Sequence, residues 1–101
     1  MSIDLTFFTK LVASDLQSKL DFLQDKYPEI FPYHYVIYKA RIVDKVGIEI
    51  SNEFGLDPQS SFRMHVTNKL LVISTDEIAD LVRKELGKEN VIVLLNGEDL
   101  I

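Results

Sequence analysis

The chain contains no cysteine and no long apolar run, and each absence excludes a class of protein. Without cysteine there is no disulfide framework, no thiolate metal site and no cysteine nucleophile. Because small secreted domains often depend on disulfides, we expect a cytoplasmic location. The longest apolar run, residues 91–95, is far shorter than the roughly 20 residues of a transmembrane helix. The sequence starts Met-Ser-Ile-Asp, without a basic residue, so it predicts no secretory signal.

Motifs for catalysis and cofactor binding are also lacking. The glycines are isolated from one another at Gly47, Gly55, Gly87 and Gly97. They cannot form a phosphate-binding loop, a nucleophile elbow or a dinucleotide fingerprint. We therefore predict no catalytic residue, no cofactor and no enzymatic activity.

The two histidines, His34 and His65, leave one alternative open. They fall on separate predicted strands, and if those strands pair, the imidazoles could approach each other. Asp44, Glu49 or Glu53 could then complete a metal site. Their spacing matches none of the usual zinc signatures, so we favour ordinary strand histidines and predict no bound metal.

The chain does contain enough apolar surface for one packed core. Its 101 residues are 47 per cent apolar, which predicts a single globular domain over residues 1–101. Eleven basic residues against sixteen acidic ones give a net charge of −5. The excess lies in residues 1–32 and 74–101, whereas residues 33–73 carry a net charge of +1. Because an acidic chain repels phosphate backbones, nucleic-acid binding is not expected.

Hydrophobic periodicity predicts a long N-terminal helix. Apolar residues recur every three or four positions, at Leu5, Phe8, Val12, Leu16, Leu20, Leu23 and Tyr27. Ser2 or Asp4 is expected to cap this helix, and Pro28 to end it. The dipeptide Ala13-Ser14 leaves open a break into two shorter helices.

The rest of the chain predicts strands and one further helix. Aromatic and β-branched residues indicate strands over residues 33–43, 48–51, 62–66, 69–73 and 91–95, with turns at 44–47 and 67–68. Ser74 and Glu77 form a capping box for a helix that ends at Gly87. The order is α-β-β-β-β-α-β, and its last three elements form a C-terminal β-α-β unit with parallel strands. We therefore predict an α+β fold with a mixed sheet.

Two of the predicted strands are apolar on both faces. In residues 69–73 and 91–95 neighbouring apolar side chains point to opposite sides, whereas a sheet with one wet face alternates more strictly. If both helices cover the same face, the other face needs a partner. Our first hypothesis is therefore a protein–protein interaction module that self-associates as a homo-oligomer or docks into a larger complex, as a phage or bacterial accessory or structural protein.

The densest aromatic cluster predicts the contact surface of this module. It comprises Tyr33, Tyr35 and Tyr38 with Lys39 and Arg41 beside them, and Arg63 and Lys69 on the same predicted sheet. Tyrosine is enriched at protein interfaces, and we expect the loop over residues 52–61 to order on binding. Such residues can also stack single-stranded nucleic acid. The net charge of only +1 over residues 33–73 favours a protein partner.

The acidic residues support a second hypothesis. Asp76, Glu77 and Asp80 in the last predicted helix, with Glu98 and Asp99, are expected to form an acidic docking surface. The chain is then an inhibitor or immunity-type protein that blocks a basic site on a target protein. The middle of the chain resembles the α-β-β-β-α order of double-stranded RNA-binding domains, but acids stand where their basic contacts are needed. In topology alone, the small acidic α+β chain as a whole is similar to secretion chaperones, toxin-immunity proteins and phage tail-tube or neck proteins. No membrane partner is expected.

Overall fold

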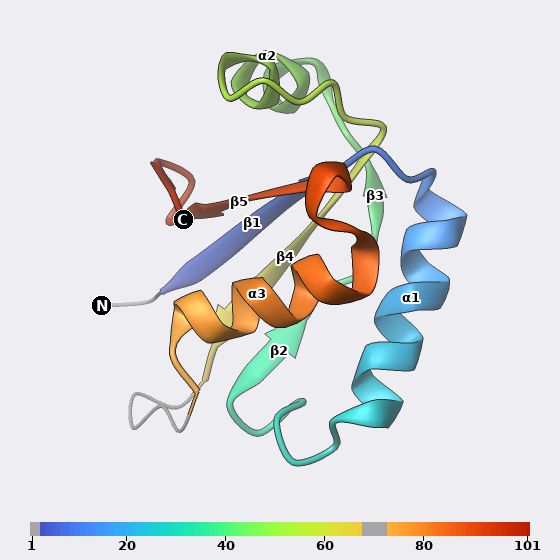
Figure 1. Ribbon diagram of the computed structural model, residues 1–101, viewed down its shortest axis with the longest axis vertical. Helices are drawn as coiled ribbons and strands as arrows, with labels where there is room; N and C mark the ends of the chain where they lie inside the picture. The colour runs from blue at the N-terminus through green and yellow to red at the C-terminus, as the bar shows by residue number, and fades with distance from the viewer. Residues whose placement is uncertain (1–2, 68–72) are drawn as a thin grey trace.

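An antiparallel sheet runs through the middle of the molecule, with helices packed against it (Figure 1). The computed structural model describes residues 3–67 and 73–101. Its strands are β1 (Asp4–Thr9), β2 (Tyr35–Ile37), β3 (Arg41–Ile42), β4 (Ser60–Val66), β5 (Val91–Leu95) and β6 (Asp99–Leu100). Its helices are α1 (Ala13–Lys26), α2 (Lys45–Glu53), α3 (Thr75–Leu86) and the short 3-10 helix η1 (Lys88–Asn90). The strand order is β2-β4-β1-β5-β6, and β3 also pairs with β4.

The central strand is β1, which lies between β4 and β5 and pairs with both. The prediction of a helix starting near Leu5 is therefore wrong, because α1 begins only at Ala13. Residues 6–9 are threonine and phenylalanine, which favour strands. Phe7 is fully buried, and Phe8 is only 5 per cent exposed, in a second core. The spacing of Leu5 and Phe8 happens to match a helical period, although both residues belong to a strand buried on both faces.

One face of the sheet packs against α1 and α3. The helices contribute Leu16, Leu20 and Leu23 from α1, and Ile78, Val82 and Leu86 from α3. These side chains cover alternate strand residues, among them Phe7 and Phe62, whose rings stack with centroids 4.3 Å apart. The predicted second helix is confirmed: Ser74 accepts a hydrogen bond from the Glu77 backbone, and Gly87 ends α3 at a φ of 97°.

The opposite face of the sheet is covered at one end by α2. The predicted strand at 48–51 and turn at 44–47 are wrong, since residues 45–53 form this helix. Asp44 caps it by accepting a hydrogen bond from the Gly47 backbone N–H at 2.7 Å. A Cβ atom at Gly47 would lie 2.6 Å from Val43 Cγ2 and 3.1 Å from Phe8 Cε1, so glycine allows α2 to lie close to the sheet. A helix cap and this close approach thus outweigh the local strand propensity.

The expected strand over 33–43 is divided into β2 and β3, which both pair with β4. Between them the Tyr38 N–H donates to the Arg63 carbonyl, and the Ala40 N–H donates to Gln17 Oε1 of α1. The backbone N–H groups of Tyr38 and Ala40, between the two strands, therefore have hydrogen-bond partners although they do not belong to a regular strand pairing. The predicted strands at 62–66 and 91–95 are confirmed within β4 and β5. The strand at 69–73 and the turn at 67–68 fall mostly outside the described residues, and β6 was not predicted.

The small α+β architecture is confirmed, although the N-terminal helix is of ordinary length. Each pairing between described strands is antiparallel. The strands on either side of α3, β4 and β5, run in the same direction, because both are antiparallel to β1 between them. None of the described helices is both long and apolar enough to cross a membrane.

Tyr35 lies inside the main core rather than on the surface. Its side chain is fully buried, and its hydroxyl donates a hydrogen bond to the Ile73 carbonyl at 2.7 Å. Burial raises the pKa of this hydroxyl to about 12, and the negative charge of Glu77 acts in the same direction. Tyr35 therefore holds β2 to the segment that leads into α3 and is not available to a binding partner.

We expect Phe7→Ala to lower the free energy of unfolding by about 3–5 kcal/mol, because it leaves a cavity in the core and removes the stack on Phe62. Phe22 is 52 per cent exposed, so Phe22→Ala should change it by less than about 0.5 kcal/mol. Urea unfolding followed by circular dichroism measures both values. Equal effects of the two substitutions would contradict the central position of β1.

We expect Tyr35→Phe to lower the free energy of unfolding at neutral pH by about 1 kcal/mol, through loss of the hydrogen bond to Ile73. Because folding raises the pKa of Tyr35 above 10.0, ionisation favours the unfolded chain. The wild-type protein should therefore lose stability between pH 10.0 and about 12, and the variant should lose less. Denaturation at several pH values tests this, with the exposed Tyr33→Phe as control. An identical alkaline profile for Tyr35→Phe and wild type would contradict it.

Candidate functional site

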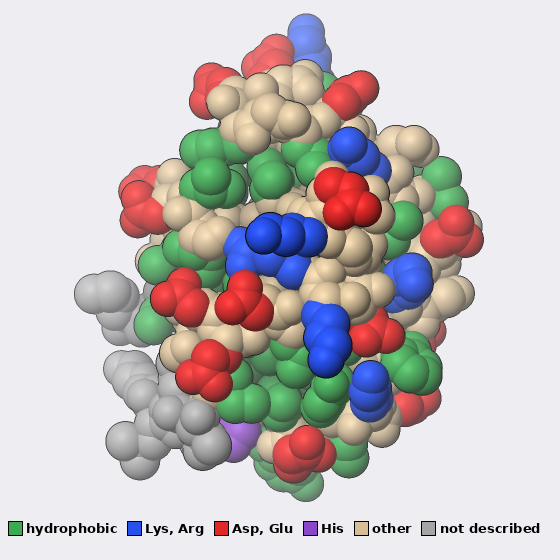
Figure 2. Space-filling model, viewed as in Figure 1, with side chains coloured by type: hydrophobic (Ala, Val, Ile, Leu, Met, Phe, Trp, Pro, Cys, Tyr) green, Lys and Arg blue, Asp and Glu red, His purple; other side chains and the backbone are tan. Residues whose placement is uncertain are grey.

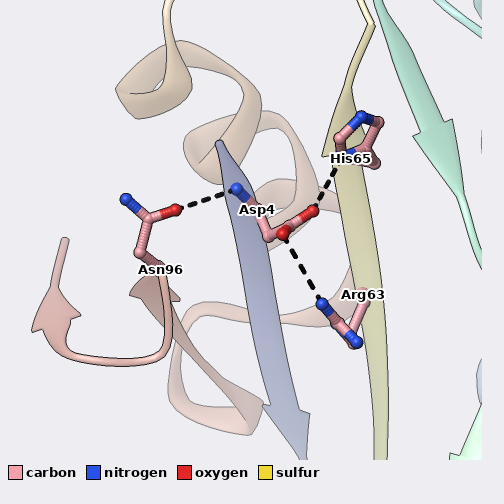
Figure 3. Close-up of polar contacts among 4 residues, drawn as sticks. All are labelled: Asp4, Arg63, His65 and Asn96. Carbon is pink, nitrogen blue, oxygen red and sulfur yellow. Dashed lines mark hydrogen bonds and ion pairs between the residues drawn. The ribbon is translucent and has the colours of Figure 1, made fainter. Parts of the chain in front are cut away.

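The face of the sheet away from α1 and α3 carries a polar row across neighbouring strands (Figure 3). Asp4 lies opposite His65 in the register of β1 and β4, and its Oδ1 is 2.8 Å from His65 Nδ1. Its other carboxylate oxygen lies 3.6 Å from Arg63 Nη2. The Asp4 backbone N–H donates to Asn96 Oδ1 just after β5. One carboxylate therefore orients two basic side chains on an open strand surface.

Beside this row lies a basic groove, defined by Tyr38, Lys39, Arg41, Ile42, Val46 and Arg63. It consists of two adjoining hollows of about 250 and 230 Å³ that share Arg41 and Arg63. β3 and the start of α2 border the larger hollow, and Thr6 and Phe8 of β1 also line it. A groove with several basic side chains and exposed apolar ones can bind a partner that carries both carboxylates and apolar groups.

The structure separates the residues of the predicted tyrosine surface. Tyr33 and Tyr38 are 72 and 49 per cent exposed, and Lys39 and Arg41 are exposed as well. Tyr35 is the exception, since it is fully buried. Tyr38, Lys39 and Arg41 come together with Arg63, which lies far away in the sequence. Contact with a partner at these residues is thus sterically possible for all but Tyr35.

The residues of the predicted acidic docking surface are all exposed, at Asp76, Glu77, Asp80, Glu98 and Asp99. Arg83 links the two parts of this surface: its Nη1 lies 2.8 Å from Asp80 Oδ1, and its Nη2 donates to the Ile101 carbonyl. Glu77 accepts a hydrogen bond from the Ser74 hydroxyl. In Figure 2, acidic side chains gather towards the N-terminal end of α3, with basic side chains over its other half. Part of the negative charge is therefore already compensated within the chain.

The structure does not assemble the metal site that the histidines left open. His65 contacts Asp4, whereas Asp44, Glu49 and Glu53 belong to α2 and its cap, at the other end of the sheet. In residues 3–67 and 73–101, no three histidine or carboxylate side chains are arranged to hold a metal ion. The loop expected to order on binding is already packed, because Leu56, Pro58 and Ser60 are buried.

Sequence reasoning missed Asp4 and Val46 as surface residues of this region. Asp4 was assigned to a helix start, and its contact with His65 joins positions 61 residues apart. Val46 was placed in a turn rather than at the start of α2. The run of threonine and phenylalanine at 6–9 was the signal that could have identified β1 and hence Asp4.

Comparison with known proteins adds three findings. The chain is similar to one chain of the CdiA-CT/CdiI toxin and immunity complex from Burkholderia pseudomallei, with a TM-score of 0.92 and 20 per cent identity. The alignment covers 97 per cent of this chain and 95 per cent of that one, which shows a shared fold. A search of curated proteins gives no match. The family model of the CDI System Immunity Component matches residues 1–99. The chain therefore belongs to the CDI System Immunity Component family.

Proposed function

We propose that this protein is an immunity protein, which binds a toxin protein and blocks its action without itself catalysing a reaction. The observation that carries this proposal is the family match over residues 1–99. The similar chain from Burkholderia pseudomallei belongs to a toxin and immunity complex, which supports the same kind of partner. Of the two hypotheses from the sequence, the immunity-type inhibitor thus has the stronger support.

The geometry of the described surface suits binding by a rigid scaffold. Arg41 and Arg63 lie on β3 and β4, and Asp76, Glu77 and Asp80 lie on α3; β4 and α3 each contribute buried side chains to the main core. Lys39 lies within the short connection between β2 and β3, and Arg41 directly follows it. This connection is hydrogen-bonded to β4 and α1. Because such a surface changes little on binding, little conformational entropy opposes association.

Two surfaces are candidates for the toxin contact, and they belong to different sides of the sheet. The acidic docking surface includes α3, which packs on the main core. The basic groove includes Arg63, which belongs to the face away from α1 and α3, as do Thr6 and Phe8 beneath the larger hollow. A compact toxin domain that contacts one surface leaves most of the other free, so substitutions can distinguish the two.

The proposal predicts protection in cells and a complex in solution. A toxin domain encoded in the same genome is expressed with or without this protein, and growth is followed. We expect growth arrest without the protein and normal growth with it. An inactivated variant of the toxin should bind the purified protein with a dissociation constant below about 1 µM in calorimetry.

A toxin domain from an unrelated system provides the control, because specific immunity should not extend to it. Continued growth arrest together with no measurable complex would contradict the proposed function. Binding without protection would show that the bound protein does not block the toxin.

Self-association, the first hypothesis from the sequence, stays a prediction. Tyr38, Ile42 and Val46 are exposed apolar residues that a second copy could contact. Light scattering at tens of micromolar tests it, and a mass equal to the monomer mass of 11.6 kDa would contradict it. Cytoplasmic localisation also stays a prediction, which fractionation of the producing cells can check.

A further inference from the structure

The basic groove is a positively charged surface on a chain whose net charge is negative. The residues that line its two hollows include the cations Lys39, Arg41 and Arg63 and one carboxylate, that of Asp44. The chain as a whole carries a net charge of −5. Such a local reversal of sign attracts groups that the rest of the surface repels.

The cations of the groove have little internal compensation. Asp44 is occupied in capping α2, where its Oδ1 accepts from the Gly47 N–H. Asp4 lies 3.6 Å from Arg63, but it also contacts His65. In the described part of the chain, neither Lys39 nor Arg41 takes part in an ion pair. An anionic partner would therefore relieve the repulsion among these cations.

Exposed apolar side chains lie beside the same cations. Ile42, Val46 and Tyr38 are 81, 62 and 49 per cent exposed, although the two cores bury most other large apolar residues. Single exposed apolar residues are common, but a group around a charged groove is typical of a protein contact. Arginine and tyrosine are also enriched among the residues that dominate protein interfaces.

These features favour a protein segment over nucleic acid. Single-stranded nucleic acid needs exposed aromatic side chains in series for stacking. Among the described residues that line the groove, Phe8 and Phe62 are buried, and Tyr38 is the one exposed aromatic side chain. A long phosphate backbone would also meet the acidic remainder of the surface. Ile42 and Val46 can instead pack against apolar side chains of a folded partner whose carboxylates contact the neighbouring cations.

We propose that the basic groove is the docking site for an acidic segment of the toxin, in which carboxylates contact Lys39, Arg41 and Arg63 and an apolar side chain packs on Ile42 and Val46. This inference rests on the proposed function and adds the surface and the chemistry of the partner. It assigns the contact to the open face of the sheet instead of the acidic docking surface.

The test compares two pairs of charge reversals with the inactivated toxin domain as probe. Lys39→Glu with Arg41→Glu changes the groove, whereas Lys84→Glu with Lys88→Glu changes exposed cations on α3 and η1. Each pair shifts the net charge by the same amount. We expect the groove pair to weaken binding by about 30-fold or more, and the control pair by less than about threefold.

Two milder measurements keep the test independent of folding defects. Ile42→Ser alters a side chain that is 81 per cent exposed and should weaken binding by about tenfold without changing the melting temperature. The affinity of the wild-type protein should fall with rising salt, and the salt dependence should be smaller for Lys39→Gln with Arg41→Gln. Thermal melts of all variants verify that they are folded.

The possible results distinguish a failure of the proposed function from a failure of the groove assignment. If the wild-type protein does not bind the toxin, the proposed function and this inference both fail. If it binds and the groove variants bind equally well, only the groove assignment fails. Loss of binding on Asp76→Lys with Asp80→Lys, but not on the groove changes, assigns the contact to the acidic docking surface. A groove-dependent shift of a short single-stranded oligonucleotide, or a groove-dependent dimer, identifies a different occupant and overturns the assignment to the toxin.

Discussion

The structure depends on the pairing of β1 with a neighbour on each side. This strand satisfies its backbone through β4 and β5 and buries Phe7 and Phe8 in different cores. It thereby connects the layer formed by α1 and α3 with the smaller layer under α2. The same pairing puts β4 and β5 in one direction, which leaves α3 to cross over β1 between them. Without β1 neither core is complete, and the larger hollow of the basic groove loses Thr6 and Phe8 from its lining.

The two candidate surfaces show that the charge of one surface of a small chain can have the opposite sign to its net charge. The acidic residues of α3 lie over the main core, where Arg83 and the capping box of Ser74 engage some of them. The basic residues of the groove lie on the other side and have few acidic neighbours. The net charge therefore describes solubility and repulsion of phosphate, but it does not identify the surface that meets a partner.

Local signals in the sequence were sufficient for some elements and not for others. Ser74 and Gly87 cap the two ends of one helix, and Glu77 lies in its first turn, so α3 could be predicted from neighbouring residues. β1 and α2 depend on distant contacts: Phe8 packs near Gly47, and Asp4 meets His65 across the sheet. Their apolar spacing fits more than one secondary structure, and only tertiary pairing selects among them. A hydrogen-bonded interruption that includes Gln17 of α1 likewise divides the strand predicted over residues 33–43.

The same distinction applies to the candidate site. Lys39 and Arg41 are close in sequence to Tyr38, and strand propensity placed Arg63 on the same predicted sheet, so these four residues could be grouped from the sequence. The addition of Val46 required the structure, because residues 45–53 form α2 instead of a turn and a strand. The burial of Tyr35 could not be predicted from the sequence alone. The face of the sheet on which its side chain lies depends on the pairing of β2 with β4, in which Tyr35 is opposite Val66.

Hydrogen bonds between Asp4 and Asn96 hold two positions near opposite ends of the sequence close together. The Asn96 N–H donates to the Asp4 carbonyl at 2.7 Å, so positions near the two ends lie side by side at one margin of the sheet. Gly55 is exposed and lies in the turn that directly follows α2. A short peptide could therefore join the ends while the chain is opened at Gly55, which gives a circular permutant with the same strand neighbours.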